Sequence, residues 1–328
     1  MLPTCLHCTQ GPASPATAPQ LRDVRTRRPT SLRVGDTPMR TVIASALHDG
    51  CGAFPRRARD SDARPLALAD MTAWRDVIIG GMPTIPPLQP ALPPYVEALP
   101  PPALRDRLCR VWRYRVEPAA DAQSRVLPDG CVDLIWDGRR LFVAGPDQQA
   151  SVARLAAGTT LTGLRLAPGT AHRVLGTSMQ ALTDRRVDAD MVLGTRARAL
   201  QRRLGEGADP LPTLLAAVAA SDVVVDTRMA WLFAALSADR PAGIPALAHG
   251  LGISERGLHR HCLQAFGYGP KVLERILRLQ RLLRLAGQVP TLTAAALDAG
   301  YADATHLSHD VRRLTGLTPT QLVRDHGR

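Results

Sequence analysis

Two similar patterns near the end of the chain constrain its fold more than any other feature. They span residues 245–260 and 293–309, and each joins a short Ala/Leu-rich stretch, a glycine and a second amphipathic stretch. The glycine permits a sharp turn between two helices that pack at a large angle. Ser254 and Asp303 stand where their side chains can accept hydrogen bonds from the first N–H groups of the second helix. Each pattern therefore predicts a helix-turn-helix unit, whose second helix is the one that enters a DNA major groove.

A continuous basic helix is predicted between the two units. It begins at Gly269-Pro270, where proline suits the first turn, and ends at Gly287. Its arginines can contact phosphates, or the helix can simply space the two units, and both roles remain open at this point. Its charged side chains are Lys271, Arg275, Arg278, Arg281 and Arg284, against Glu274 alone.

The charge of the chain favours a polyanionic partner. The 328 residues carry a formal net charge of +12, although biased composition is an alternative explanation, because Lys271 is the only lysine among 41 basic residues. Placement argues for nucleic acid, since residues 245–328 hold eleven basic and six acidic side chains, a net charge of +5. An aromatic content of 4% provides few stacking platforms for single strands. Double-stranded DNA is therefore the predicted partner.

No pattern in the sequence indicates catalysis, a cofactor or a metal site. Residues 95–194 contain no Gly-x-Ser-x-Gly, Gly-rich phosphate loop or His-x-His cluster. Cys5 and Cys8 have zinc-ligand spacing but lack a second pair nearby, so we interpret the spacing as chance. The six cysteines are scattered, and no apolar run reaches the roughly 18 residues of a membrane helix. We expect a soluble cytoplasmic protein that is not an enzyme and has no membrane partner.

Composition divides the chain into four segments. Residues 1–94 are rich in Pro and Arg, which predicts either a disordered basic tail or a start codon placed too early, with Met71 or Met82 as the true start. Residues 95–194 predict a small, mostly β domain. Residues 195–240 predict a helical connector, and residues 241–328 an all-α domain with the two units. The expected fold class is α+β.

Local patterns place several elements in the β domain and the connector. Residues 131–136 and 141–144 predict a hairpin that turns at Asp137-Gly138, and Thr160–Leu166 predicts another strand. Pro168 is expected to open a helix through Leu175. Asp129 and Asp133 either face a pocket or, as we favour, lie in a turn and on a solvated strand face. Connector helices are expected at Ala197–Leu204, Leu211–Ala220 and Thr227–Leu236.

The second helix of each unit supplies the candidate DNA-contacting residues. In the first, Leu258, Cys262 and Leu263 are expected to face the core. Arginine can bond guanine through O6 and N7, although an ordinary solvated face is the alternative interpretation. The residues left facing solvent or DNA are Arg256, His259 and Arg260 in the first helix, and Ala304, Thr305, His306, Ser308 and His309 in the second, with Arg312 and Arg313 placed for phosphate contact.

Residues 245–325 resemble the DNA-binding domain of AraC/XylS-type transcriptional regulators. The resemblance rests on Ser254-x-Arg256-x-Leu258-x-Arg260, Gly267, Pro270, Gly300-Tyr301-x-Asp303-x-x-His306-Leu307-Ser308-His309 and Arg312-Arg313-x-x-Gly316-x-Thr318-Pro319. It implies seven helices, with two recognition helices in successive major grooves on one side of the duplex. It also implies base contacts from Arg256, His259, Arg260, Ala304, Thr305, His306 and His309.

Two departures from the family and a second resemblance refine this expectation. Cys262 and Val311 stand where the family usually has Phe, which predicts looser cores. Residues 95–194 resemble a small domain that often precedes this one in bacterial regulators. The stretches that carry this second resemblance are Leu127-Pro128-Asp129-Gly130, Ala144-Gly145-Pro146 and Gly163-x-x-x-x-Pro168-Gly169.

We therefore expect a bacterial, sequence-specific transcription regulator, in which the β domain senses an unidentified small-molecule effector or dimerises. RNA polymerase and a second copy of the chain are further partners to consider. One alternative is a DNA-repair alkyl-transfer protein with Cys131 as its reactive residue, and another is a ligand-binding module with a degenerate DNA-binding domain. Within the leading interpretation, Arg256 and Arg260 make the first unit the main source of sequence preference. The second unit adds affinity and register.

Overall fold

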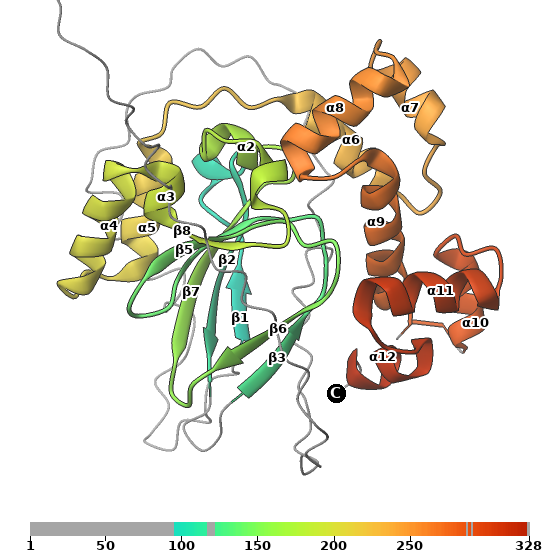
Figure 1. Ribbon diagram of the computed structural model, residues 1–328, viewed down its shortest axis with the longest axis horizontal. Coiled ribbons are helices and arrows are strands. Elements are labelled where there is room, and N and C mark those ends of the chain that lie inside the picture. Colours follow the sequence, from blue (N-terminus) through green and yellow to red (C-terminus); the bar gives the residue numbers. More distant parts are fainter. Residues whose placement is uncertain (1–94, 117–121, 287, 290, 327–328) are drawn as a thin grey trace, which may run out of the picture. The chain divides into compact units, whose positions relative to one another are not determined.

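The computed structural model describes residues 95–116, 122–286, 288–289 and 291–326 (Figure 1). The expectations for residues 1–94, including the Cys5/Cys8 pair and the alternative starts, lie outside the described residues. Among the helices in the described ranges, none combines the length and the apolar character that crossing a membrane requires.

Two antiparallel sheets make up the first half of the described chain (Figure 1). The larger is six-stranded, with strand order β1-β2-β7-β4-β5-β8, and the smaller pairs β3 with β6. The strands are β1 (Tyr95–Ala98), β2 (Leu108–Arg115), β3 (Ala122–Val126), β4 (Asp133–Trp136), β5 (Leu141–Ala144), β6 (Ser151–Leu155), β7 (Thr160–Leu166) and β8 (Arg186–Asp188).

The strands with clear local signals form where the sequence predicts them. β4 and β5 pair as a hairpin in which Trp136 faces Leu141, and the Asp137 N–H donates to the Arg140 carbonyl at 3.2 Å. β7 has the predicted bounds. The helix expected from Pro168 is shorter, because residues 168–170 form a turn before α2 (Ala171–Val174).

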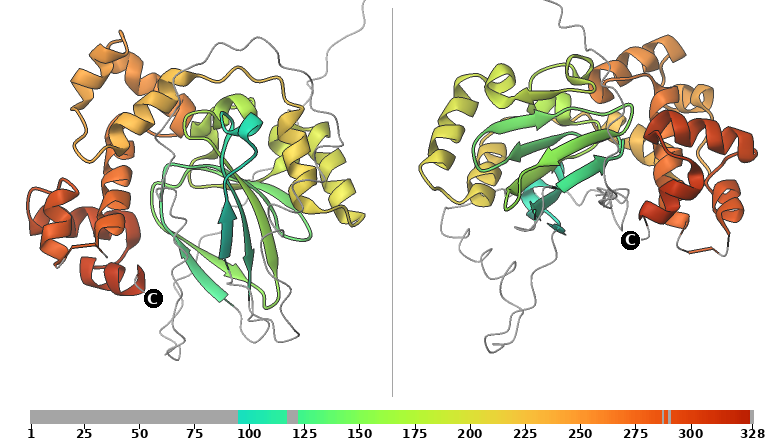
Figure 2. Two further views of the ribbon diagram at one scale, coloured as in Figure 1. Left: turned by 180° about the vertical axis from the view of Figure 1, so that it is seen from behind. Right: turned by 60° about the horizontal axis from the view of Figure 1, so that its bottom comes forward.

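One face of the larger sheet packs against three helices (Figure 2). These are α3 (Ala189–Leu193), α4 (Thr195–Gly205) and α5 (Pro210–Ala219). Leu134 and Leu164 from the sheet share one apolar cluster with Leu204 and Leu214 from the helices. Two of the three predicted connector helices are therefore packed onto the sheet.

The opposite face carries buried charge, which corrects the expectation for Asp133. The Arg165 guanidinium donates to both carboxylate oxygens of Asp133 at 3.2 and 3.3 Å, and the Trp112 indole N–H donates at 2.8 Å. The side chain of Asp133 is therefore enclosed, and the predicted solvated strand face is wrong. Register explains this, because Asp133 and Arg165 are direct partners across β4 and β7.

Asp129 lies in the predicted turn but joins the same charge cluster. Its carboxylate accepts the Cys131 N–H at 2.9 Å and lies 3.5 Å from Arg165, while Gly130 adopts a φ of +81°. Burial raises the pKa of Asp129 to about 6 against the opposing effect of the nearby Arg165 charge, since desolvation penalises the carboxylate.

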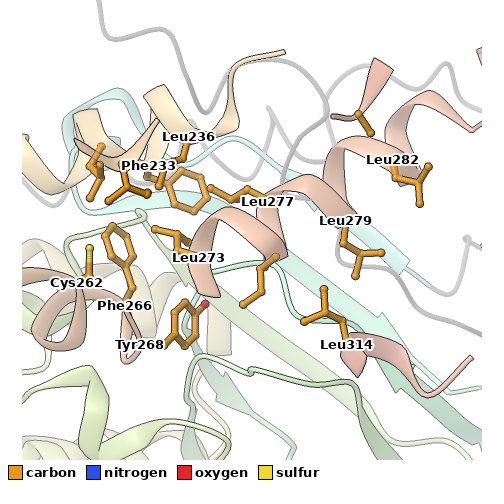
Figure 3. Packing of buried hydrophobic residues seen from close by; sticks show 14 of the residues in the cluster. Phe233, Leu236, Cys262, Phe266, Tyr268, Leu273, Leu277, Leu279, Leu282 and Leu314 are labelled. Atoms are coloured by element: carbon orange, nitrogen blue, oxygen red, sulfur yellow. The ribbon is translucent and has the colours of Figure 1, made fainter. Parts of the chain in front are cut away.

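The remaining helices, from α6 onward, share a second apolar core. They are α6 (Thr227–Ser237), α7 (Ile244–Gly250), α8 (Glu255–Phe266), α9 (Pro270–Leu285), α10 (Leu292–Asp298), α11 (Ala304–Thr315) and α12 (Pro319–His326). Figure 3 shows Phe233 of α6, Phe266 of α8 and Leu273 of α9 packed together. The centroids of the two phenyl rings lie 6.1 Å apart. The third predicted connector helix thus belongs to this core. The α+β fold class is confirmed.

Candidate nucleic-acid interface

The first helix-turn-helix unit consists of α7 and α8. Gly252, with a φ of +67°, turns the chain between the two helices. The Ser254 hydroxyl caps α8 by accepting the Gly257 N–H at 3.1 Å. α8 ends at Gly267, which adopts a φ of +85° in the left-handed region that favours glycine. Both ends of this helix are therefore fixed by local sequence, as the pattern predicts.

The two faces of α8 differ sharply. Leu258 and Cys262 are fully buried, and Phe266 completes the apolar stripe one turn later. We expected Leu263 in the core, but it is only half-buried. Phe266, four residues after Cys262, continues the buried apolar stripe of α8 in its place. Arg256, His259 and Arg260 are exposed on the other face, where the sequence places them.

The second unit repeats this construction in α10 and α11. Gly300, with a φ of +93°, makes the turn, and the Asp303 carboxylate caps α11 by accepting the His306 N–H at 2.7 Å. α11 ends at Gly316, which has a φ of +72°. Cys262 and Val311, the two small residues that predicted looser cores, are both fully buried in the shared cluster.

α11 presents a continuous polar face. Leu307, Val311 and Leu314 are buried at helical spacing. The residues exposed on the outer side are Ala304, Thr305, His309, Arg312 and Arg313, all predicted candidates. In the described part of the chain, neither Arg312 nor Arg313 has a hydrogen-bonded or ion-paired side chain, so both guanidinium groups are available to a ligand.

His306, a further candidate, is held inward by its neighbours. Its Nδ1 accepts the Ala302 N–H at 3.3 Å, and its Nε2 lies 3.1 Å from Arg278 and 3.4 Å from Asp310. The ring also meets Tyr301 edge-on, with centroids 5.2 Å apart. Since both ring nitrogens are engaged, His306 is built to orient the start of α11.

Asp310 has a structural role at this surface that we did not predict from the sequence. Its side chain is 4% exposed and lies 3.1 Å from Arg275 and 3.5 Å from Arg278, both on α9. This buried carboxylate ties the second recognition helix to the connecting helix. The sequence did contain a signal for this inward-facing acid, because Asp310 stands four residues after His306 and directly before the apolar Val311.

The arginines of the connecting helix α9 are engaged within the protein, and phosphate contact by this helix stays a prediction. Arg281 is fully buried and donates to the carbonyls of Ala299 at 2.7 Å and Leu236 at 2.9 Å. Arg284 pairs with Asp239 at 2.9 Å. Of the charges predicted for this helix, Lys271 remains exposed. Most of the exposed basic side chains of the two units therefore lie on α8 and α11, and Lys271 of α9 and Arg324 of α12 are exposed as well.

The described thiols are poorly placed for chemistry. Cys109, Cys131 and Cys262 are buried and are not in disulfides. Burial raises the pKa of Cys262 to about 12, which suppresses its thiolate. Within the described ranges, no three His, Cys, Asp or Glu side chains gather as a set that could hold a metal ion.

Two capped helix-turn-helix units with outward polar faces define a DNA-binding protein. Residues 247–325 match a family described as a helix-turn-helix domain, and residues 96–188 match a domain of unknown function, DUF6597. The C-terminal part of this chain is thus an AraC-type helix-turn-helix domain.

Comparison with individual proteins adds little to the family matches. No curated protein matches the chain. An apo ToxT variant from Vibrio cholerae strain SCE256 is similar at 10% identity and a TM-score of 0.37, covering 72% of this chain and 99% of that one. ToxT from Vibrio cholerae O395 shares 10% identity with a TM-score of 0.37, covering 71% and 98%. Unsaturated fatty acid bound ToxT from strain SCE256 shares 9% with a TM-score of 0.34, covering 72% and 97%.

Proposed function

We propose that this protein is a transcription regulator that binds DNA sequence-specifically and reads two successive major-groove segments with α8 and α11. The observation that carries the proposal is the pair of capped recognition helices, each with an exposed polar face opposite a buried apolar one. A recognition helix contacts base edges with its N-terminal residues, and half-sites lie about 10–10.5 base pairs apart.

Each exposed residue is assigned a role from its chemistry and position. Arg256 and Arg260 reach guanine bidentately, and His259 donates to a base acceptor beside them. On α11, Ala304 and Thr305 offer apolar contact to a thymine methyl, with His309 as a hydrogen-bonding partner. Arg312 and Arg313 contact phosphates. His306, for which the family resemblance implies a base contact, instead orients α11 in this proposal.

The division of labour in the rest of the chain is also a proposal. Cluster membership favours a boundary within residues 221–226, since α4 and α5 pack with the sheet while α6 packs with the DNA-binding helices. The β part would sense a small-molecule effector or mediate dimerisation. RNA polymerase would be the partner of a promoter-bound activator.

The test is selection of DNA from a random-sequence pool with the full chain, followed by sequencing. We expect one enriched motif with two half-sites, and we expect Arg256→Ala with Arg260→Ala to lose the preference at one of them. The matched control is Arg202→Ala with Arg203→Ala, two exposed arginines on α4, which should enrich the wild-type motif. Absence of any enriched motif with the wild-type chain would reject sequence-specific binding.

A further inference from the structure

The two recognition helices have no direct polar link to each other. Within the described residues, no hydrogen bond or ion pair joins a residue of α8 to one of α11, and the chain between them runs through α9 and α10. This helix is 16 residues long, or roughly 24 Å. A tilt of roughly 8° at one end of such a lever moves the other end by roughly 3.4 Å, one base-pair step. A second support that prevents such a tilt therefore helps to fix the half-site spacing.

The β part of the chain contacts the C-terminal end of α8. The Thr183 hydroxyl, just after η3 (Met179–Leu182), lies 3.1 Å from the Gly267 carbonyl and 3.0 Å from the Met179 carbonyl. Gly267 is so closely covered that an added Cβ would lie 2.9 Å from Pro146 Cγ. The end of the first recognition helix is therefore seated against residues 146 and 183.

The same part of the chain contacts the C-terminal end of α11. The Ala150 N–H donates to the Leu314 carbonyl at 2.6 Å, and Arg125 of β3 donates to the Thr315 carbonyl at 2.9 Å. The last carbonyls of a helix lack partners within it, and a cation there also complements the helix dipole. These contacts cap the second recognition helix from outside its own domain.

A single small structure connects the two contact points. Residues 145–150 run beside residues 183–186, and we call this pair of segments the bridge. The Asp184 carboxylate accepts the Gln148 N–H at 2.7 Å and its side-chain amide at 3.0 Å, while Asp147 pairs with Arg186 at 2.6 Å. Asp184 holds a φ of +57°, a conformation unusual for a non-glycine residue. The bridge is thus internally cross-linked between α8 and α11.

The connecting helix is also held from this side. The Gln280 amide of α9, buried in the core, donates to the Pro128 carbonyl at 2.7 Å. Leu127 belongs to the same apolar cluster as the DNA-binding helices. Tilting either unit about α9 would therefore break contacts with the β part at more than one point.

We propose that the bridge and Arg125 hold the two recognition helices at a fixed separation, so that Arg125, Thr183 and Asp184 are positioning residues that set the spacing between half-sites. This inference rests on the proposed function. It assigns to the β part a mechanical role in DNA binding that is independent of any effector.

The experiment compares full-length chains on DNA selected by the wild type and on the same DNA with one base pair inserted between the half-sites. One base pair rotates a groove by roughly 35°, so we expect the insertion to weaken wild-type binding at least about tenfold. Arg125→Ala with Thr183→Ala should reduce this spacing penalty to below about threefold, with base preference within each half-site unchanged.

Conservative variants and a control separate positioning from folding. Arg125→Lys with Thr183→Ser retains a cation and a hydroxyl and should restore most of the spacing penalty, while Arg154→Ala, an exposed arginine on β6, should behave as wild type. Should the double variant unfold, Asp184→Asn and Asp184→Gly replace it. Asparagine keeps an oxygen that can accept the Gln148 N–H, so Asp184→Asn should preserve the spacing penalty. Glycine has no such oxygen, so Asp184→Gly should reduce the spacing penalty.

The outcomes distinguish this inference from the function on which it rests. A wild-type chain that enriches no DNA rejects both. A wild-type chain that enriches two half-sites but tolerates the insertion, or a double variant that keeps the full spacing penalty, overturns the role of the bridge and leaves sequence-specific binding intact.

Discussion

Charged side chains near the recognition helices serve two different purposes, and burial separates them. Arg312 and Arg313 are exposed and unpaired within the described chain, whereas Asp310 is buried beneath arginines of α9. A buried carboxylate with several cationic neighbours fixes geometry, because removing it leaves those cations without compensation. Neighbouring residues on one helix therefore have unrelated roles.

Replacing Asp310 should destabilise the fold. Since Arg275 and Arg278 remain partly solvated, we expect Asp310→Ala to lower the free energy of unfolding by about 2 kcal/mol, less than for a fully buried pair. Urea unfolding of the full chain measures this. Asp298→Ala, at an exposed acid on α10, is the control and should change stability by less than about 0.5 kcal/mol. Equal effects of the two substitutions would contradict the structural role of Asp310.

Asp129 should make stability depend on pH in an unusual direction. Its carboxyl keeps its proton up to about pH 6 in the folded chain but releases it near 3.8 when unfolded, so folding is favoured by protonation. The contribution is fully present below about pH 4 and is lost as pH rises through about 6, amounting to about 1–3 kcal/mol.

The measurement for Asp129 is the change in unfolding free energy between pH 4.5 and pH 6.5 for wild type and Asp129→Asn. The amide does not titrate and its oxygen can still accept the Cys131 N–H, so the variant should lose less stability over this interval. A variant with the same pH slope as the wild type would show that Asp129 does not titrate there.

At the residue scale, local chemistry was predictable and burial of charge was not. Ser254 and Asp303 were predicted as caps because a cap depends on residues within one turn. The sequence suggested that Arg281 faces solvent, yet its side chain lies inside the core. Burial is possible because its guanidinium donates hydrogen bonds to the carbonyls of Ala299 and Leu236, which are far apart in sequence. Asp133 was misassigned for the same reason, since its partner Arg165 comes from another strand.

At the element scale, helices and strands that depend on nearby residues could be predicted from the sequence, whereas those that depend on distant partners could not. Alternation defined Thr160–Leu166, and Asp137-Gly138 marked the hairpin of β4 and β5. Strands β1, β3, β6 and β8 were not predicted, since they are short and depend on partners elsewhere in the chain. The polar faces of α8 and α11 were predictable from helical periodicity, although their use in DNA reading remains a proposal.

The two recognition helices should respond differently to loss of charge. Arg312→Ala with Arg313→Ala removes two proposed phosphate contacts, so it should weaken binding similarly on all sequences and reduce the salt slope by about 2. Arg256→Ala with Arg260→Ala should instead relax base preference. This loss of preference should be larger than the loss caused by substitutions at His306 and His309. Titrations at several salt concentrations with matched and mismatched DNA separate these effects, and a reversed pattern would refute the assignment.

For the whole molecule, the DNA-binding helices do not make a complete core without α6. Leu232 and Leu236 of α6 are fully buried in the shared cluster, and Phe233 stacks on Phe266 (Figure 3). Each such side chain stabilises the fold by about 1.5–3 kcal/mol. This arrangement follows from tertiary packing, which explains why sequence alone grouped α6 with α4 and α5.

A pair of fragments tests this organisation. Residues 222–328 retain α6 and should unfold cooperatively, whereas residues 241–328 lack it and should melt at a much lower temperature or without a cooperative transition. Circular dichroism during heating provides the comparison. Equal melting of the two fragments would show that α6 is dispensable. Failure of the longer fragment to fold would instead favour a degenerate DNA-binding domain.

The central claim is that α8 and α11 occupy successive major grooves on one side of the duplex. Hydroxyl-radical footprinting of the full chain on its selected DNA tests this most directly. We predict two protected segments on one face, about 10–10.5 base pairs apart, with Arg256→Ala and Arg260→Ala together removing protection at only one. A single protected segment, or two on opposite faces of the duplex, would contradict this account.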